Sequence, residues 1–156
     1  MKILFVCTGN TCRSPMAEGL FTEIIRSKGM KSEDFTVVSA GLMTIDGVEA
    51  SEYSVRVLLD KGINISGHLS KRLTDDMVEE ADLILTMTLT HKIAVTMKND
   101  KAIGKTYTLK EFAGYTDGDM DISDPFGMDI DAYKECAEEI LMALEISVKK
   151  ITGELI

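Results

Sequence analysis

The side chains best suited to chemistry lie near the start of the chain, where a cysteine and an arginine stand six residues apart. Cys7 offers a thiolate, which is a strong nucleophile, and Arg13 offers a planar guanidinium that can bind two phosphoryl oxygens at once. Glycine and asparagine between them allow the backbone to curl, so that successive amides can surround a dianion. The spacing therefore predicts a phosphate-binding loop with a nucleophilic thiol. Besides these two residues, the loop contains Thr8, Gly9, Asn10, Thr11, Cys12 and Ser14.

The loop must be positioned by the elements on either side of it. Residues 2–6 form a short apolar run without alternation, which is typical of a strand buried on both faces. Ser14 at the cap and Pro15 at the first helical position predict a helix, which ends at Gly29. The positive end of that helix and the loop amides would meet at one point, where they stabilise an anion or a thiolate. Ser14 is also placed to donate a hydrogen bond to the sulfur of Cys7.

Strand and helix patterns alternate through the rest of the chain. This alternation predicts βαβ units, and hence an α/β fold with a parallel sheet. Ligands of such folds bind at the carboxyl ends of the strands, which again selects the loop after the first strand. The further predicted strands cover residues 35–39, 82–87 and 106–109, and the further predicted helices cover residues 49–61, 74–81, 90–97 and an apolar stripe from Tyr133 to Ile151.

Composition limits the class of protein. A length of 156 residues predicts one domain, residues 1–156, with one core. No apolar run approaches the roughly 20 residues of a membrane helix, and the net charge of -9 disfavours nucleic acid, so neither a membrane nor a nucleic acid is an expected partner. The apolar start is too short for a signal peptide. The chain has three cysteines, and a low, odd number disfavours a framework of disulfide bonds. We therefore expect a cytoplasmic protein with free thiols.

The loop resembles the active-site loop of the low-molecular-weight protein-tyrosine phosphatase family. The likeness runs through residues 5–18 and returns at Ser39-Ala40-Gly41 and Asp124-Pro125-Phe126-Gly127. The resemblance implies a three-layer sandwich with a four-stranded parallel sheet in the order 2-1-3-4, helices on both faces, and a phosphate-binding loop after the first strand. It also implies a phosphorylated protein as substrate and inorganic phosphate as product, with no cofactor.

The same resemblance implies roles for the matching positions. Cys7 would form a cysteinyl-phosphate, Arg13 would bind the phosphoryl oxygens, and Asp124 would protonate the leaving group and then activate water. The positions expected to brace the loop are Asn10, Ser14, Ser39 and His68.

Chemistry alone leaves the choice of acid open. Asp124 precedes a proline, which favours a rigid turn, but five other aspartates lie near it in the sequence. Only the resemblance selects Asp124 among them. His91 stands near a predicted helix start and is expected at the surface. No cysteine and histidine cluster has zinc spacing, so no metal is expected.

Two residues bear on the substrate. Tyrosine-specific members of the family usually carry a bulky aliphatic residue where this chain has Thr11, and they carry more aromatic residues after the Asp-Pro pair than the single Phe126 found here. Thr11 adds a hydroxyl that a guanidinium could contact. In both features the chain resembles a bacterial branch that acts on phosphoarginine in proteins. Phosphoarginine is therefore the expected substrate, and phosphotyrosine is the alternative.

The cysteines bear on three further interpretations. Cys12 is either a space-filling residue or the partner of Cys7 in a reversible disulfide that switches the enzyme off, and both interpretations stay open. A thiol-dependent arsenate reductase shares the fold, but it needs further cysteines in mid-chain, and residues 66–98 contain none. A non-catalytic phosphopeptide-binding module would not require both Cys7 and Asp124.

Overall fold

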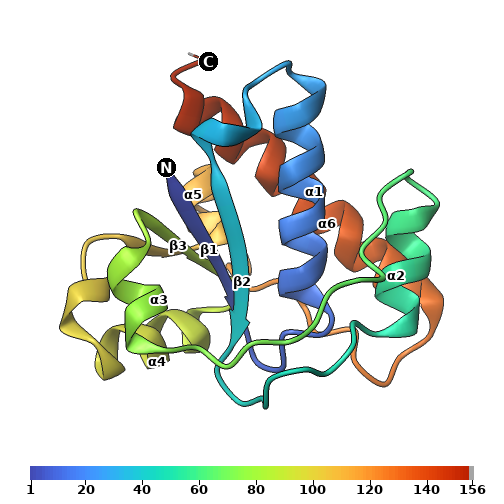
Figure 1. Cartoon of the computed structure of the whole chain (residues 1–156), viewed down its shortest axis with the longest axis horizontal. Helices are drawn as coiled ribbons and strands as arrows, with labels where there is room; N and C mark the ends of the chain where they lie inside the picture. Colours follow the sequence, from blue (N-terminus) through green and yellow to red (C-terminus); the bar gives the residue numbers. More distant parts are fainter. Residues whose placement is uncertain (155–156) are drawn as a thin grey trace.

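A parallel sheet of four strands forms the middle layer of the computed structural model, which describes residues 1–154 (Figure 1). The strands lie in the order β2-β1-β3-β4, as predicted. Cys7 at the end of β1 pairs with Gly41 at the end of β2, and Val6 pairs with Thr86 in β3. The carboxyl ends of the strands therefore meet at one edge. The strands are β1 (Lys2–Cys7), β2 (Thr36–Gly41), β3 (Leu83–Thr86) and β4 (Thr106–Thr108).

Helices cover both faces of the sheet, which confirms the three-layer sandwich. On one face α1, α5 and α6 pack with α2, which lies against α1 and α6, and on the other face α3 and α4 pack. The first group is α1 (Arg13–Ser27), α2 (Glu52–Leu59), α5 (Leu109–Ala113) and α6 (Ile130–Thr152). The second is α3 (Asp75–Glu80) and α4 (Leu89–Lys98), and two 3-10 turns, η1 (Ser32–Asp34) and η2 (Asp100–Ala102), complete the elements.

The side chains of β1 point alternately to the two faces of the sheet, and both faces are covered, which explains why the strand is apolar throughout. Ile3, Phe5 and Cys7 belong to the core under α1 and α6, whereas Leu4 and Val6 belong to the core under α3 and α4. Successive side chains of a strand point to opposite faces, so a strand covered on both sides needs apolar residues at every position. The same alternation places Cys7 on the face where α1 begins.

The predicted last helix is confirmed as α6. Most of its predicted stripe is buried on the side that faces the sheet, including Tyr133, Ala137 and Ile140, whereas Leu141 and Ile151 are partly buried. A fully buried side chain of the size of Ile140 contributes about 1.5–3 kcal/mol relative to an exposed one. The Asp129 carboxylate accepts a hydrogen bond from the main chain at the start of α6, and Gly153, at φ +71°, ends it.

Three local predictions were wrong. Ser14 does not cap α1, because Arg13 is already helical and the Ser14 hydroxyl is used inside the loop. The second helix begins at Glu52 rather than residue 49, since the amide of Ser51 is donated to the loop carbonyl of Thr11. Residue 109 does not extend β4, because Thr108 starts α5 with a capping box.

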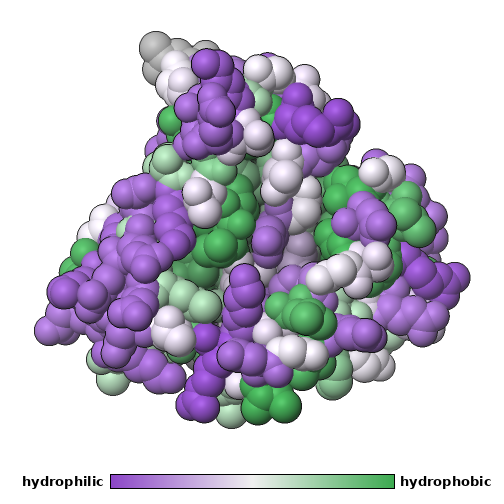
Figure 2. Space-filling model, viewed as in Figure 1, coloured by the Kyte–Doolittle hydropathy of each residue, from purple (hydrophilic) through white to green (hydrophobic). Residues whose placement is uncertain are grey.

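The surface is mostly polar, with apolar groups gathered in places. Figure 2 shows hydrophilic residues over α3 and α4 and a hydrophobic group at the lower edge, below β2. The loop that follows β2 runs along this edge in Figure 1 and contains Met43 and Ile45, which are 80% and 72% exposed. Between residues 1 and 154, none of the helices combines the length and the apolar character needed to cross a membrane.

Candidate active site

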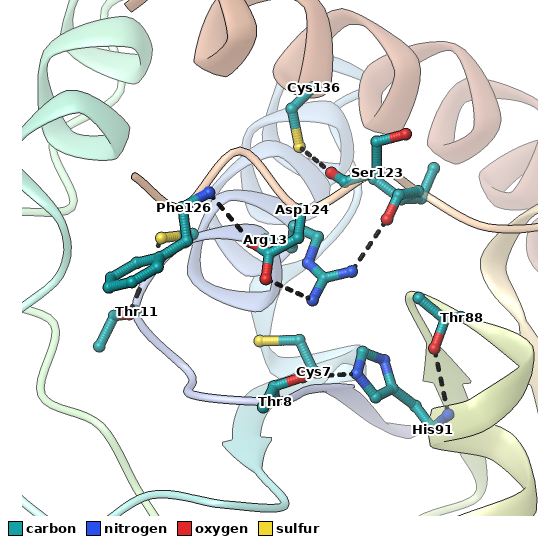
Figure 3. Close-up of polar contacts among 12 residues, drawn as sticks. Cys7, Thr8, Thr11, Arg13, Thr88, His91, Ser123, Asp124, Phe126 and Cys136 are labelled. Carbon is teal, nitrogen blue, oxygen red and sulfur yellow. Dashed lines mark hydrogen bonds and ion pairs between the residues drawn. The ribbon is translucent and has the colours of Figure 1, made fainter. Parts of the chain in front are cut away.

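A cavity of about 200 Å³ opens at the carboxyl end of β1, where α1 begins. Figure 3 shows the phosphate loop beneath it, with the side chains of Arg13 and Asp124 facing Cys7 and the ring of Phe126 at one side. The structure thus brings the three residues predicted to do chemistry to one place. The lining residues are Cys7, Thr8, Gly9, Thr11, Cys12, Arg13, Asp124 and Phe126.

Cys7 is held at the floor of the cavity by hydrogen bonds within the loop. The side chain is only 2% exposed, and the backbone N–H of Asn10 is donated to its sulfur at 3.3 Å. Ser14 Oγ lies 2.9 Å from Cys7 Sγ and accepts a hydrogen bond from Asn10 Nδ2 at 2.8 Å. Because Asn10 is a donor to Ser14, the hydroxyl hydrogen of Ser14 is free to be donated to the sulfur.

Asn10 joins the loop to its surroundings. It is fully buried and adopts a left-handed conformation at φ +55°, as the sequence predicts. Its Nδ2 donates to Ser39 Oγ at 2.9 Å, and its Oδ1 accepts from the backbone of Lys71 at 2.9 Å. Its carbonyl lies 2.8 Å from Nε2 of His68. Ser39 and His68 therefore both contact the loop through Asn10.

Sequence reasoning missed one member of this network. Ser39 Oγ donates to the Glu18 carboxylate at 2.5 Å, so a residue of α1 sets the direction of the Ser39 hydroxyl. With its hydrogen given to Glu18, Ser39 presents a lone pair to Asn10. A sequence clue to this contact exists: Glu18 lies in the first turns of α1, on the side of the helix that faces β2.

Arg13 is a buried cation fixed by two partners. The side chain is 5% exposed; NH1 donates to the carbonyl of Ile122 at 2.9 Å, and NH2 lies 3.4 Å from Asp124 Oδ2. A guanidinium anchored in this way keeps further N–H groups directed at the cavity. It supplies a local positive charge in a chain whose net charge is -9.

Asp124 and its acidic neighbours have different contacts in the structure. Asp121 accepts a hydrogen bond from the backbone of Leu89 at the start of α4, and Asp129 caps α6. Asp124 lines the cavity instead, with a half-exposed side chain whose Oδ1 accepts from the backbone of Phe126 at 3.1 Å. Of these acids, Asp124 has the position needed to exchange a proton with a group bound above Cys7.

The sequence as a whole matches one family model, that of the low molecular weight phosphotyrosine protein phosphatase, over residues 2–155. The chain belongs to this family. Its resemblance at the loop is therefore confirmed over nearly the full length.

Two phosphatases illustrate the range of relatives in this family. A protein-arginine-phosphatase of Bacillus subtilis is 41% identical over 153 residues, which cover 96% of this chain and 98% of the relative. A low molecular weight protein-tyrosine-phosphatase, PtpB, of Staphylococcus haemolyticus is 39% identical over 142 residues, which cover 90% of this chain and 93% of the relative.

A solved structure in the family carries a covalent phosphoryl group. It is a Cys-to-Ser mutant of the YwlE arginine phosphatase with a phosphorylated active-site serine. It superposes on this chain with a TM-score of 0.90 at 39% sequence identity, covering 97% of this chain and 96% of that one.

The prediction that His91 is a surface residue was wrong. It is 6% exposed, and its Nε2 lies 2.8 Å from the hydroxyl of Thr8 in the family's phosphate loop. Burial, and then the nearby charge of Arg13, lower the pKa of His91 from 6.5 to about 4, although Asp121 and Asp124 oppose this shift. The topology could have revealed this contact, since β1 and β3 are neighbours and their following loops share an edge.

Cys12 and Cys136 are both buried and free. Cys12 Sγ lies 3.5 Å from the hydroxyl of Tyr133, to which Ser51 donates at 3.1 Å. Burial and the contact with Cys12 raise the pKa of Tyr133 to about 12. Cys136 contacts the carbonyl of Ser123, and burial raises the pKa of its thiol to about 12, which makes it a poor nucleophile.

Thr11 and Phe126 form one side of the cavity. Thr11 is partly buried, and its Oγ1 lies 3.8 Å from Cys12 Sγ, whereas Phe126 is 74% exposed. Both predicted specificity residues therefore line the cavity. Across the residues described, no three His, Cys, Asp or Glu side chains are grouped to hold a metal ion.

Proposed function

We propose that this chain is a cysteine-dependent protein phosphatase that acts on phosphoarginine in proteins and releases inorganic phosphate. The observation that carries the proposal is the convergence of Cys7, Arg13 and Asp124 on one cavity. The identity of 41% with a protein-arginine-phosphatase supports the choice of substrate. The net charge of -9 supports a protein rather than a nucleic acid as the carrier of the phosphoryl group.

The first step is attack of the Cys7 thiolate on phosphorus. A sulfur–phosphorus bond forms while the bond from phosphorus to the guanidine nitrogen breaks, and Asp124 gives its proton to that nitrogen. Arg13 and the loop amides hold the phosphoryl oxygens as charge moves over them. The phosphorylated serine in the related arginine phosphatase supports a covalent intermediate at this position.

The second step returns the enzyme to its starting state. Asp124, now a carboxylate, takes a proton from water, and the hydroxide formed attacks the cysteinyl-phosphate. The sulfur–phosphorus bond breaks, and the Cys7 thiolate leaves with its charge stabilised by the hydroxyl of Ser14, 2.9 Å away. Inorganic phosphate is released and Asp124 is protonated again.

Substrate choice is supported by the wall of the cavity. A guanidine carries N–H donors, which match the hydroxyl of Thr11, whereas a phenol ring gains most from aromatic stacking. Only Phe126 among the lining residues is aromatic. Low molecular weight tyrosine phosphatase activity is the second candidate, supported by the 39% identity with PtpB of Staphylococcus haemolyticus.

The test compares turnover of phosphoarginine and phosphotyrosine peptides of the same sequence. We expect a higher kcat/KM for phosphoarginine, and we expect Thr11→Ile to shift the ratio toward phosphotyrosine. Preference of the wild-type protein for phosphotyrosine would select the second candidate.

The mechanism is tested with p-nitrophenyl phosphate. Cys7→Ser should abolish turnover, and Asp124→Ala should lower kcat by roughly 10²–10⁴-fold, the usual contribution of acid–base catalysis. Asp117→Ala, which changes an exposed acid on the same loop, is the matched control. Turnover that survives Cys7→Ser would refute the mechanism, and phosphopeptide binding without turnover by the wild type would favour a binding module.

We also propose that Cys7 and Cys12 form a reversible disulfide under oxidation. Both thiols are free and line the same cavity, which supports the proposal. Peroxide treatment followed by mass spectrometry should find the bridge, and dithiothreitol should restore activity. Irreversible loss without a bridge would contradict the proposal.

A further inference from the structure

Thr8 is a lining residue of the cavity whose hydroxyl contacts a residue outside the phosphate loop. Figure 3 shows Thr8 beside His91, whereas Thr11 lies under the ring of Phe126. Thr8 is exposed and lines the cavity, and its Oγ1 lies 2.8 Å from Nε2 of His91. No role in the reaction proposed above depends on this side chain.

His91 is a rigid support for that hydroxyl. The side chain is 6% exposed, and its backbone N–H is donated at 3.1 Å to the side chain of Thr88, which caps α4. The imidazole is therefore fixed at the start of a helix that packs against the sheet. A hydroxyl bonded to a fixed ring loses its freedom to rotate, so its remaining hydrogen-bonding capacity points in a set direction.

The hydrogen-bond count shows what that capacity is. A hydroxyl has one hydrogen and two lone pairs, and the imidazole of His91 occupies one of the three. Nδ1 of His91 is buried and has no partner within residues 1–154. A buried bare acceptor is more common than a buried unpaired N–H, so Nε2 carries the hydrogen and donates it to Thr8. In either tautomer Thr8 keeps at least one lone pair for the cavity.

We infer that Thr8, positioned by His91, is a second specificity-determining residue that accepts a hydrogen bond from an N–H of the guanidine of phosphoarginine. The inference rests on the proposed function and names a further contact of the same site. A guanidine offers only donors along its edge, and a phenol ring offers none. Two hydroxyls, from Thr8 and Thr11, would then face a leaving group that only phosphoarginine supplies.

A neutral imidazole suits this role. A cation at His91 would repel a guanidinium in the cavity, and the charged groups around the ring act in opposite directions: Arg13 disfavours its protonation, while Asp121 and Asp124 favour it. Burial, together with Arg13, outweighs the two aspartates and lowers the pKa of His91 to about 4, so the ring is neutral near pH 7.

The competing explanation is that the pair only braces the start of the loop. A structural brace would affect every substrate alike, because all of them use the same phosphate site. A contact with the guanidine would affect phosphoarginine alone. The ratio of kcat/KM for a phosphoarginine peptide to kcat/KM for p-nitrophenyl phosphate separates the two, whatever loss both substrates share.

The experiment measures this ratio in matched variants. Thr8→Val keeps the shape without the hydroxyl and should lower the ratio roughly tenfold, the size of one hydrogen bond to a polar partner. Thr8→Ser should restore it. His91→Gln, whose amide can replace Nε2, should keep a higher ratio than the shorter His91→Asn.

The outcomes are distinct. Equal loss for both substrates in Thr8→Val, or wild-type ratios in both His91 variants with a native circular dichroism spectrum, would overturn the inference while leaving the proposed function intact. A wild-type protein that prefers phosphotyrosine would overturn the proposed function and the inference with it. If Thr8→Val does not fold, the ratio is compared between Thr8→Ser and the two His91 variants. A ratio that is lower in His91→Asn than in Thr8→Ser and His91→Gln supports the inference, and equal ratios in all three overturn it.

Discussion

Lowering the pH from 7 to 4 should destabilise this protein through the protonation of one buried side chain. The pKa of His91 is about 4 in the folded protein, against 6.5 for an ordinary histidine, mainly because the ring is buried. Between these two values the unfolded chain binds the proton and the folded protein does not. Stability therefore rises with pH through this window and is lost as the pH falls.

The size of the effect follows from the two pKa values. One pKa unit corresponds to about 1.4 kcal/mol, so the difference between 6.5 and about 4 gives about 3 kcal/mol of unfolding free energy lost between pH 7 and pH 4. A domain of this kind is stable by about 5–15 kcal/mol, so the loss is a large fraction of the total.

Urea unfolding at pH 7, 5.5 and 4 measures the effect. Carboxylates also titrate in this pH range. The wild-type protein is therefore compared with His91→Gln, which cannot gain a proton at this position. We expect the wild type to lose about 3 kcal/mol more than the variant between pH 7 and pH 4. Equal losses in the two proteins would refute the assignment of a buried, neutral His91.

Three further predictions concern the phosphate loop. Asn10→Ala should cost about 2–4 kcal/mol in urea unfolding and most of the p-nitrophenyl phosphatase activity, since its amide joins three partners; near-native values would contradict its role. Gly41→Ala should cost about 1–3 kcal/mol, because a Cβ would lie 2.8 Å from a carbonyl of the loop, whereas Gly67→Ala, with open space, should stay within about 0.5 kcal/mol. Ser14→Ala should slow breakdown of the intermediate more than its formation, seen as a burst of p-nitrophenol, because the leaving Cys7 thiolate loses its donor; absence of a burst would count against that donor.

The elements around the loop could be predicted because their signals are local. The unbroken apolar run of β1 indicates a strand that is buried on both faces. The spacing of Tyr133, Ala137 and Ile140 indicates a helix, α6, that is buried along one stripe. Helix boundaries were less accurate. Ser14 has the residue type of a cap, but the sulfur of Cys7 and the amide of Asn10 compete for its hydroxyl.

The sequence by itself determined the reactive pair, because Cys7 and Arg13 are joined by one short loop whose curl depends on neighbouring residues. The family resemblance selected Asp124, Ser39 and His68 by their motifs, but only the tertiary structure decided that His91 and the carbonyl of Ile122 complete the site. His91 is 83 residues from Thr8, and Ile122, which anchors Arg13, is 109 residues from it. By residue type Asp124 equals its acidic neighbours, and the folded chain places it in the cavity while Asp121 and Asp129 hold helix starts. Contacts over such separations depend on how the sheet orders its strands, and no local pattern of residues records that order.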